Sequence, residues 1–231
     1  MRRGLGGAYR EIGAQAEAER ALREAPAPAS RLGRSTVRST ALHNLGPALA
    51  QRGALAGARA VEEEAIAIFL ATHDRRLEVG SRHYLARILT QLGDHAAAAA
   101  EGRASLAMGG HAPEVQLGAF AALARTDIAL GRPADALENA RSAMALFKSM
   151  GSLEEGESFV RFVWIEAPFA SGRRSEARDA AMDARMAVLR RAATIHEPAW
   201  QQSFLALPEN VRILALATSR DPRQSFCARS A

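Results

Sequence analysis

Apolar residues recur along most of this chain at the three- and four-residue spacing of amphipathic helices. These runs come in pairs, and a glycine separates the two runs of each pair. In the segment 123–147, LARTDIALGRPADALENARSAMALF, Gly131 follows one run and Pro133 opens the next. The sequence has no β-branched runs of the kind that form strands. It therefore predicts helix–turn–helix units.

The units repeat at a nearly constant period. Turn glycines are spaced 40, 40, 38 and 41 residues apart, at Gly13, Gly53, Gly93, Gly131 and Gly172. Five residues after each comes an alanine: Ala18, Ala58, Ala98, Ala136 and Ala177. Eight residues before each comes a large apolar residue: Leu5, Leu45, Leu85, Leu123 and Trp164. The alanine allows two helices to pack closely, and the large residue fills the space between units.

We therefore predict a repeat array over residues 1–195, with units at about 1–30, 35–73, 75–110, 112–150 and 153–195. Asp94 and Ser175 are candidate N-caps, and Pro113 suits the first position of a helix. Pro47 falls inside a predicted helix, which we expect it to kink or locally break. The run Glu62-Glu63-Glu64 is interpreted as the solvated face of its helix, because adjacent helical residues point in different directions.

The pattern changes after Thr194. Residues 196–218 are predicted to form a capping helix, in which Trp200, Phe204 and Leu205 cover the open face of the last unit. The polar segment 219–231 is expected to be a disordered tail.

The net charge of +5 raises the possibility of nucleic-acid binding. However, Lys148 is the only lysine, and the arginines occur as scattered pairs rather than along one face. A mildly basic solvated surface is the favoured interpretation. A nucleic-acid-associated transcriptional regulator is kept as the alternative function.

The chain shows no pattern of reactive residues. Its six histidines form no HExxH motif, its serines lie in no GxSxG motif, and no glycine-rich phosphate loop follows a strand. Cys227 is the only cysteine, so no disulfide can form within the chain. We predict a protein that is not an enzyme and needs neither a metal nor a cofactor. With no signal peptide and no apolar run of about 18 residues, no membrane association and a cytoplasmic location are expected.

The first unit resembles the tetratricopeptide repeat. Leu5, Gly6 and Tyr9 match the first helix of that repeat, and Ala18, Leu22 and Ala25 match its second helix. The resemblance continues almost to the end of the chain, with a period longer than the usual 34 residues. It implies an all-α fold, a right-handed α-α superhelix; HEAT-type repeats are the structural alternative.

In that family the first helix of each unit lines a concave groove that binds peptide or protein segments. The resemblance implies nine groove positions here: His43, Gln51, His83, Arg87, Thr90, Gln91, Arg125, Phe162 and Glu166. The family's carboxylate clamp is not reproduced, since Pro47 stands where an asparagine is needed. Phe159, Trp164 and Phe169 are expected to belong to the core.

The segment from Trp200 to Arg212 resembles the end of long repeat arrays in bacterial serine/threonine kinases and signal-transduction ATPases. This resemblance implies the docking or sensor region of such a protein, without its catalytic part. Met1 falls inside the predicted first helix of the first unit, four residues before Leu5. We therefore expect further repeats, and a kinase or ATPase domain, upstream in the same reading frame.

Overall fold

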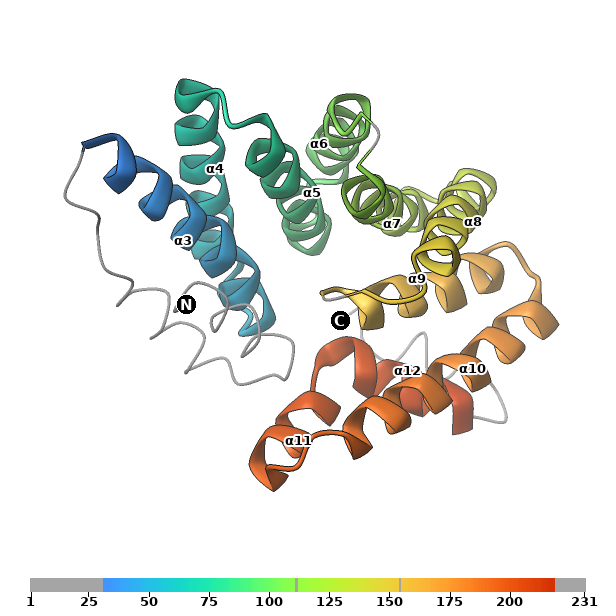
Figure 1. The fold of residues 1–231 in the computed structure, drawn as a ribbon. Helices are drawn as coiled ribbons and strands as arrows, with labels where there is room; N and C mark the ends of the chain where they lie inside the picture. Colours follow the sequence, from blue (N-terminus) through green and yellow to red (C-terminus); the bar gives the residue numbers. More distant parts are fainter. Residues whose placement is uncertain (1–30, 111, 154, 219–231) are drawn as a thin grey trace.

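The computed structural model describes residues 31–110, 112–153 and 155–218, and these residues form helices joined by short turns (Figure 1). The predicted unit 1–30 and tail 219–231 lie outside the described residues. The helices are α3 (Arg31–Gln51), α4 (Leu55–Thr72), α5 (Arg75–Leu92), α6 (His95–Met108), α7 (Pro113–Ala129), α8 (Pro133–Met150), α9 (Glu157–Ala170), α10 (Arg174–Ala193), α11 (Pro198–Leu205) and α12 (Pro208–Thr218).

Helices α3 to α10 form four antiparallel pairs that stack side by side into a curved array (Figure 1). The first helices of successive units, α3, α5, α7 and α9, also contact one another directly and form the inner row. The second helices α4, α6, α8 and α10 form the outer row. The predicted all-α solenoid is confirmed.

The corner of each unit is closed in the same way. Gly53, Gly93, Gly131 and Gly172 have φ angles between 68° and 83°, a left-handed conformation that favours glycine. The amide of the next residue donates to the carbonyl five residues earlier, as from Asp94 to Leu89 at 3.0 Å and from Arg132 to Asp127 at 2.8 Å. This is the Schellman pattern, in which the amides of a left-handed glycine and of the next residue donate hydrogen bonds to the last carbonyls of a helix.

The repeated alanines lie where the two helices of a unit meet. Ala58, Ala98 and Ala136 have no exposed surface, and Ala177 is 5% exposed. Among the large residues eight positions before the corners, Leu85 and Leu123 are buried, whereas Leu45 and Trp164 are half-buried. The periodic pattern therefore reports real contacts between helices.

Two of the predicted helix ends are confirmed and one is wrong. The carboxylate of Asp94 accepts a hydrogen bond from the Ala97 amide at 3.2 Å, and Pro113 is the first residue of α7. Ser175 does not cap α10, because that helix already begins at Arg174. The corner glycine determines this start, since the turn after Gly172 uses only Arg173.

The interpretation of Glu62 as a solvated residue is also wrong. Glu62 is fully buried, while Glu63 and Glu64 are exposed. Three consecutive residues span more than half a helical turn, so one of them faces the same side as Ala58 and Phe69. Glu62 packs over Gly46 of α3, and its carboxylate lies 3.9 Å from Nδ1 of His43.

The C-terminal segment forms two helices rather than one. Pro208 has no amide hydrogen to continue the helix from α11, so the chain turns at Leu207 and begins α12. Phe204, Leu207, Ile213 and Leu216 pack with residues of α9 and α10 in one apolar cluster. Trp200, by contrast, is 39% exposed, so it covers less of the last unit than expected.

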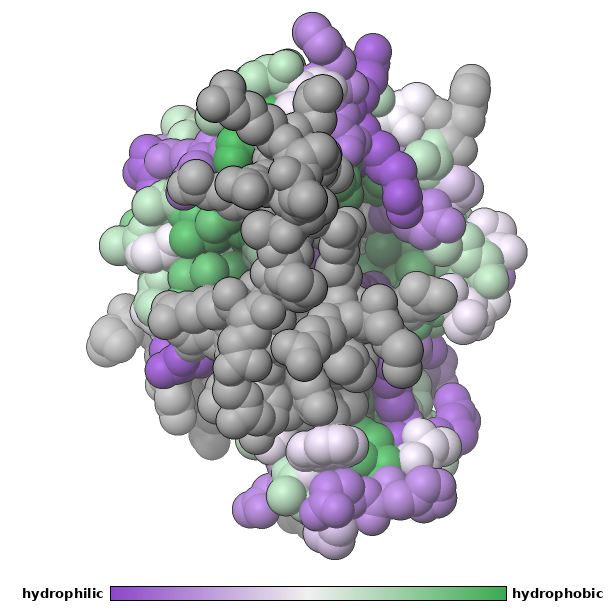
Figure 2. All heavy atoms as spheres, turned by 60° about the vertical axis from the view of Figure 1, so that its left-hand side comes forward, coloured by the Kyte–Doolittle hydropathy of each residue, from purple (hydrophilic) through white to green (hydrophobic). Residues whose placement is uncertain are grey.

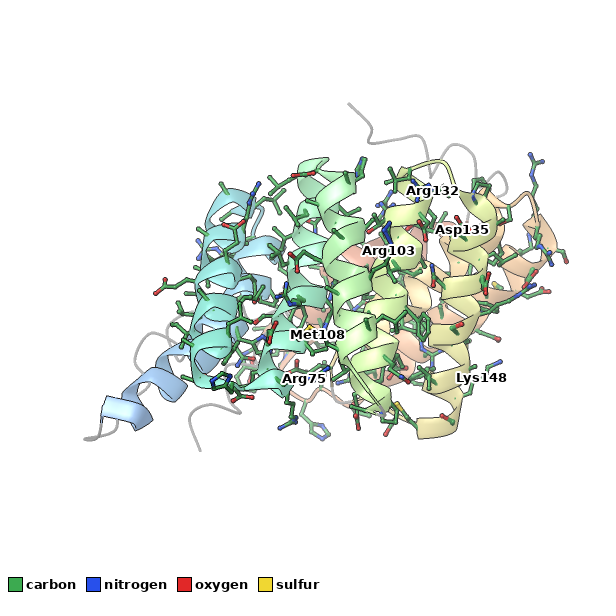
Figure 3. All side chains as sticks on the ribbon, turned by 90° about the horizontal axis from the view of Figure 1, so that it is seen from above. Arg75, Arg103, Met108, Arg132, Asp135 and Lys148 are labelled. Carbon is green, nitrogen blue, oxygen red and sulfur yellow. The ribbon has the colours of Figure 1, made fainter. Side chains whose placement is uncertain are left out.

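On the face drawn in Figure 2, the coloured part of the surface shows polar residues with apolar ones between them. Viewed from above, Arg103, Arg132 and Asp135 lie toward one end of the stacked helices, and Arg75 of α5 and Lys148 of α8 lie toward the other (Figure 3). Within the described ranges, no helix is long and apolar enough to cross a membrane. The basic residues labelled in Figure 3 are thus divided between two ends, and the acidic residue Asp135 lies at the same end as Arg132.

Replacing Gly102 with alanine tests the close packing of α6 on α7. A Cβ at Gly102 would lie 2.8 Å from Cδ2 of Leu123, which is itself buried. We expect Gly102→Ala to lower the free energy of unfolding by about 1–3 kcal/mol, as measured by urea denaturation. The matched control is Gly57→Ala in α4, where the nearest atom is 3.9 Å away and the residue is exposed. That variant should be neutral or up to about 1 kcal/mol more stable. Equal effects at both positions would contradict this account.

Candidate peptide-binding groove

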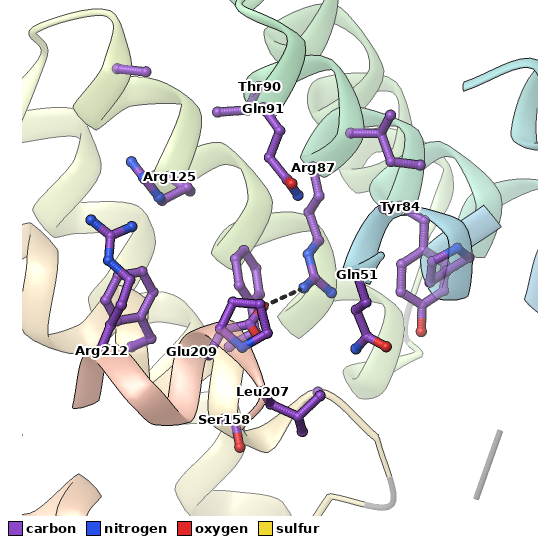
Figure 4. Close-up of a pocket in the computed structure, with 18 of the residues that line it drawn as sticks. Gln51, Tyr84, Arg87, Thr90, Gln91, Arg125, Ser158, Leu207, Glu209 and Arg212 are labelled. Carbon is purple, nitrogen blue, oxygen red and sulfur yellow. Dashed lines mark hydrogen bonds and ion pairs between the residues drawn. The ribbon is translucent and has the colours of Figure 1, made fainter. Parts of the chain in front are cut away.

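A hollow of about 830 Å³ opens on the concave side of the array (Figure 4). It is bounded by the inner helices α3, α5, α7 and α9 and, on the remaining side, by the start of α12. We call this hollow the concave groove. Its lining includes Pro47, Gln51, Tyr84, Arg87, Thr90, Gln91, His95, Arg125, Phe159, Phe162, Leu207, Glu209 and Arg212.

Six of the nine predicted residues line the concave groove: Gln51, Arg87, Thr90, Gln91, Arg125 and Phe162. Gln51 and Gln91 each stand two residues before a corner glycine, so successive units present the same amide. The buried Oε1 of Gln51 accepts no hydrogen bond from the described residues. Thr90 is less available, because its hydroxyl bonds to the Ala86 carbonyl and to Thr126, both at 2.8 Å. Contact of these residues with a ligand stays a prediction.

The two predicted histidines lie between inner helices and do not line the concave groove. Nδ1 of His43 is 2.8 Å from Oγ of Ser81, and the ring packs against Gly80 of α5. His83 packs against Gly118 of α7 in the corresponding way. A histidine in one unit therefore fills the space that a glycine leaves in the next.

Glu166, the ninth predicted residue, lies beneath the groove surface. It is 5% exposed, and its Oε2 lies 2.9 Å from Nε of Arg125. Burial raises the pKa of the Glu166 carboxyl, and the charges of Arg125 and Arg212 oppose that rise. Arg125 is therefore held from below by a carboxylate of the neighbouring unit.

Arg87 and Arg212 are positioned by aromatic rings. The Arg87 guanidinium lies 3.7 Å from the ring centre of Phe159, and its Nη2 is 3.2 Å from Oε1 of Glu209. The guanidinium of Arg212 lies 5.0 Å from the ring centre of Phe162. Both contacts fall within the range of cation–π attraction. The groove thus combines amides, guanidinium groups and aromatic rings.

Sequence reasoning missed the contributions of Tyr84, Phe159, Glu209 and Arg212 to the groove. Phe159 was assigned to the core, and it does pack against two core clusters while also lining the groove. Glu209 and Arg212 belong to the C-terminal segment, whose return toward α5 has no signal in the repeat pattern. Tyr84 could have been found, since it lies between the predicted positions His83 and Arg87.

His43, Ser81 and Glu62 come together but are not arranged as a catalytic triad. The serine and the carboxylate both face the same ring nitrogen, Nδ1, and Ser81 and Glu62 have no exposed surface. A triad needs the serine and the acid on opposite nitrogens and an accessible serine. Among the described residues, no group of three His, Cys, Asp or Glu is placed to hold a metal ion.

Comparison with known proteins finds similarity in structure only. No protein-family model and no curated protein matches the sequence. Among solved structures, two crystal structures of nearly identical TPR-like repeats from a putative kinesin light chain of Podosopora anserina are similar. One of them, a variant with a single substitution, has a TM-score of 0.54 and 20% identity over 84% of this chain and 95% of that one. The other has a TM-score of 0.52 and 21% identity over 85% and 96%.

The fold is that of a TPR-like solenoid. At this level of identity the likeness concerns the fold alone. The predicted bacterial kinase-associated context is not addressed by these neighbours.

Removing Arg125 tests the buried ion pair under the groove. In Arg125→Ala the Glu166 carboxylate loses its opposing charge, so we expect its pKa to rise further. A carboxyl group whose pKa is raised in the folded state binds its proton more tightly there than in the unfolded chain. The folded protein therefore loses stability as the pH rises above the unfolded pKa of about 4.3. The variant should therefore be less stable than the wild type by about 1–3 kcal/mol near neutral pH. The deficit should shrink at about pH 4.5.

Urea denaturation at the two pH values measures this effect. The double variant Arg125→Ala/Glu166→Gln has no carboxyl group at this position, so its stability relative to Glu166→Gln should be the same at both pH values. Arg141→Ala is the matched control, since the Arg141–Glu176 pair is more exposed, at 48% and 32%. That substitution should change stability by less than about 0.5 kcal/mol. A deficit of Arg125→Ala that is the same at both pH values would contradict this role.

Proposed function

We propose that this chain is a non-catalytic interaction scaffold that binds a peptide or protein segment in the concave groove. The observation that carries the proposal is the lining itself. Amides from two successive units, Gln51 and Gln91, face the hollow beside Arg87, Arg125 and the rings of Tyr84 and Phe159. Amide groups can hydrogen-bond a backbone, and aromatic rings offer apolar contact, as an extended or helical segment requires.

The dimensions of the groove fit the same proposal. A hollow of about 830 Å³ is at the upper end of the range for small-molecule pockets. Most of its lining residues, including the polar side chains of Gln51, Gln91, Arg87 and Arg125, lie on helices of separate units, so these polar groups are held on rigid elements. A peptide laid across the inner helices would meet equivalent side chains at regular intervals.

We further propose that the chain is the docking region of a bacterial multidomain signalling protein that works in the cytoplasm. The support is the C-terminal segment that resembles such proteins. Nδ2 of Asn210 donates to the Phe204 carbonyl at 2.8 Å, Glu209 pairs with Arg87, and Arg212 lies on Phe162. Among the residues that carry this resemblance, Asn210 joins α12 to α11, and Glu209 and Arg212 connect α12 to the inner helices α5 and α9.

The proposal is tested by selecting peptides from a displayed library of twelve-residue sequences on the immobilised protein. Selected peptides should bind the wild type and lose about 5- to 30-fold in affinity on Gln51→Ala/Gln91→Ala, since each amide contributes about 1 kcal/mol of hydrogen bonding. Fluorescence anisotropy with labelled peptides measures the affinities. Both side chains line the groove and neither residue is fully buried, so the fold should be retained.

The matched control is the double variant Glu138→Ala/Arg141→Ala on the outer helix α8, whose residues do not line the groove. It should leave the affinities unchanged. Failure to select any peptide, or equal losses in both double variants, would contradict the proposal. Salt-dependent binding of a DNA or RNA oligonucleotide in place of peptides would instead support a nucleic-acid regulator.

A further inference from the structure

The charged side chains that line the concave groove come from the inner helices α5 and α7 and from the C-terminal helix α12. Three arginines, Arg87, Arg125 and Arg212, line it together with one acidic residue, Glu209. Arg125 is paired from beneath by Glu166, which is not part of the lining. Among the described residues that line the groove, the acidic side chain therefore belongs to the chain's own C-terminal helix α12. This side chain, Glu209, accepts a hydrogen bond from Arg87, which stands 122 residues earlier in the chain (Figure 4).

Arg87 is held ready to bind a carboxylate. Its guanidinium lies 3.7 Å from the ring centre of Phe159, which restricts its orientation, and its side chain is only 18% exposed. A guanidinium fixed in this way offers its N–H groups to a planar acidic group at little entropic cost. Glu209 takes that place with a single contact, from Nη2 to Oε1 at 3.2 Å.

Helix α12 itself is firmly attached, so only the side chain of Glu209 needs to move. Ile213 is fully buried and Leu216 is 8% exposed, both in the cluster shared with α9 and α10. Asn210 is also fully buried and bonds to the Phe204 carbonyl. Glu209 lies in the first turn of α12, where a carboxylate is favoured by the helix dipole even without an arginine. Release of Arg87 therefore leaves Glu209 in a favourable position.

We propose that Arg87 binds an acidic side chain of the partner segment and that Glu209 is an internal competitor for this position. The inference rests on the proposed peptide-binding function and adds the chemistry of the partner. The bound segment carries an Asp or Glu that replaces Glu209 on Arg87, while α12 stays in place. Free groove and bound groove then differ in which carboxylate Arg87 holds.

The test uses the tightest-binding peptide from the selection and an analogue in which each Asp and Glu is replaced by Asn and Gln. Both are measured against the full chain by fluorescence anisotropy. Glu209→Gln should tighten binding of the acidic peptide by about 3- to 10-fold, because its competitor is gone. The amide analogue should bind Glu209→Gln and the wild type equally. Arg87→Gln should weaken the acidic peptide to the level of its analogue.

Glu176→Gln is the matched control, because it removes the acid of the Arg141–Glu176 ion pair outside the groove. It should change neither affinity. The inference is overturned if the selected peptides contain no acidic residue, or if Glu209→Gln leaves the acidic peptide unchanged or weakens it. It is also overturned if that variant tightens both peptides equally, which would mean that α12 has loosened. In each of these outcomes peptides still bind the groove, so the proposed function stands separately.

Discussion

The stack depends on positions where a side chain is reduced to a methyl group or to hydrogen. Ala58, Ala98 and Ala136 have no exposed surface, and Ala98 and Ala136 pack against apolar residues of the first helix of their own unit. Gly46 and Gly102 allow a still closer approach, under Glu62 and Leu123 respectively. Since cores are packed as densely as organic crystals, one additional carbon at such a point forces the facing side chain to shift. The spacing of the two rows follows from these few small residues.

The groove is a consequence of this spacing. The inner helices touch their counterparts in the next unit, so positions with the same number relative to the corner glycine form a line along the concave face. Arg87, Arg125 and Glu166 all stand six residues before a corner. Two of these adjacent positions carry opposite charge and pair with each other, whereas the remaining arginine is left for α12. Part of the charge in and under the groove thus comes from one repeated position with varied residues.

Much of the fold could be predicted from the sequence, because the signals are local. The corner glycines are set by backbone conformation, and the alanines by the packing of helices within one unit. The burial of Glu62 was predictable in principle from helix period, but the run of three acids was interpreted as a single solvated face. The positions of His43 and His83 could not be predicted in this way, because each histidine fills the space over a glycine in the next unit, which is a contact between units.

The site was predictable only where the repeat extends. Gln51, Gln91, Arg87 and Arg125 follow from their register, and the structure brings them to one groove. Glu209 and Arg212 reach the same groove from a segment with no repeat, through contacts that depend on how far the stack curves. No spacing in the sequence encodes that distance. The groove residues could therefore be predicted within the repeat array but not in the C-terminal segment, where the repeat ends.

The contact between Arg87 and Glu209 has a bearing on how such an array can change in length. Solenoids ordinarily gain or lose whole units, because each unit touches only its neighbours. Here two side chains join the unit of α5 to a helix that follows the unit of α9 and α10, across the hollow. Their combined reach fixes how many units lie between them. Adding or removing a unit between α5 and α12 would separate Arg87 from Glu209. The number of units between these two helices is therefore constrained by their ion pair.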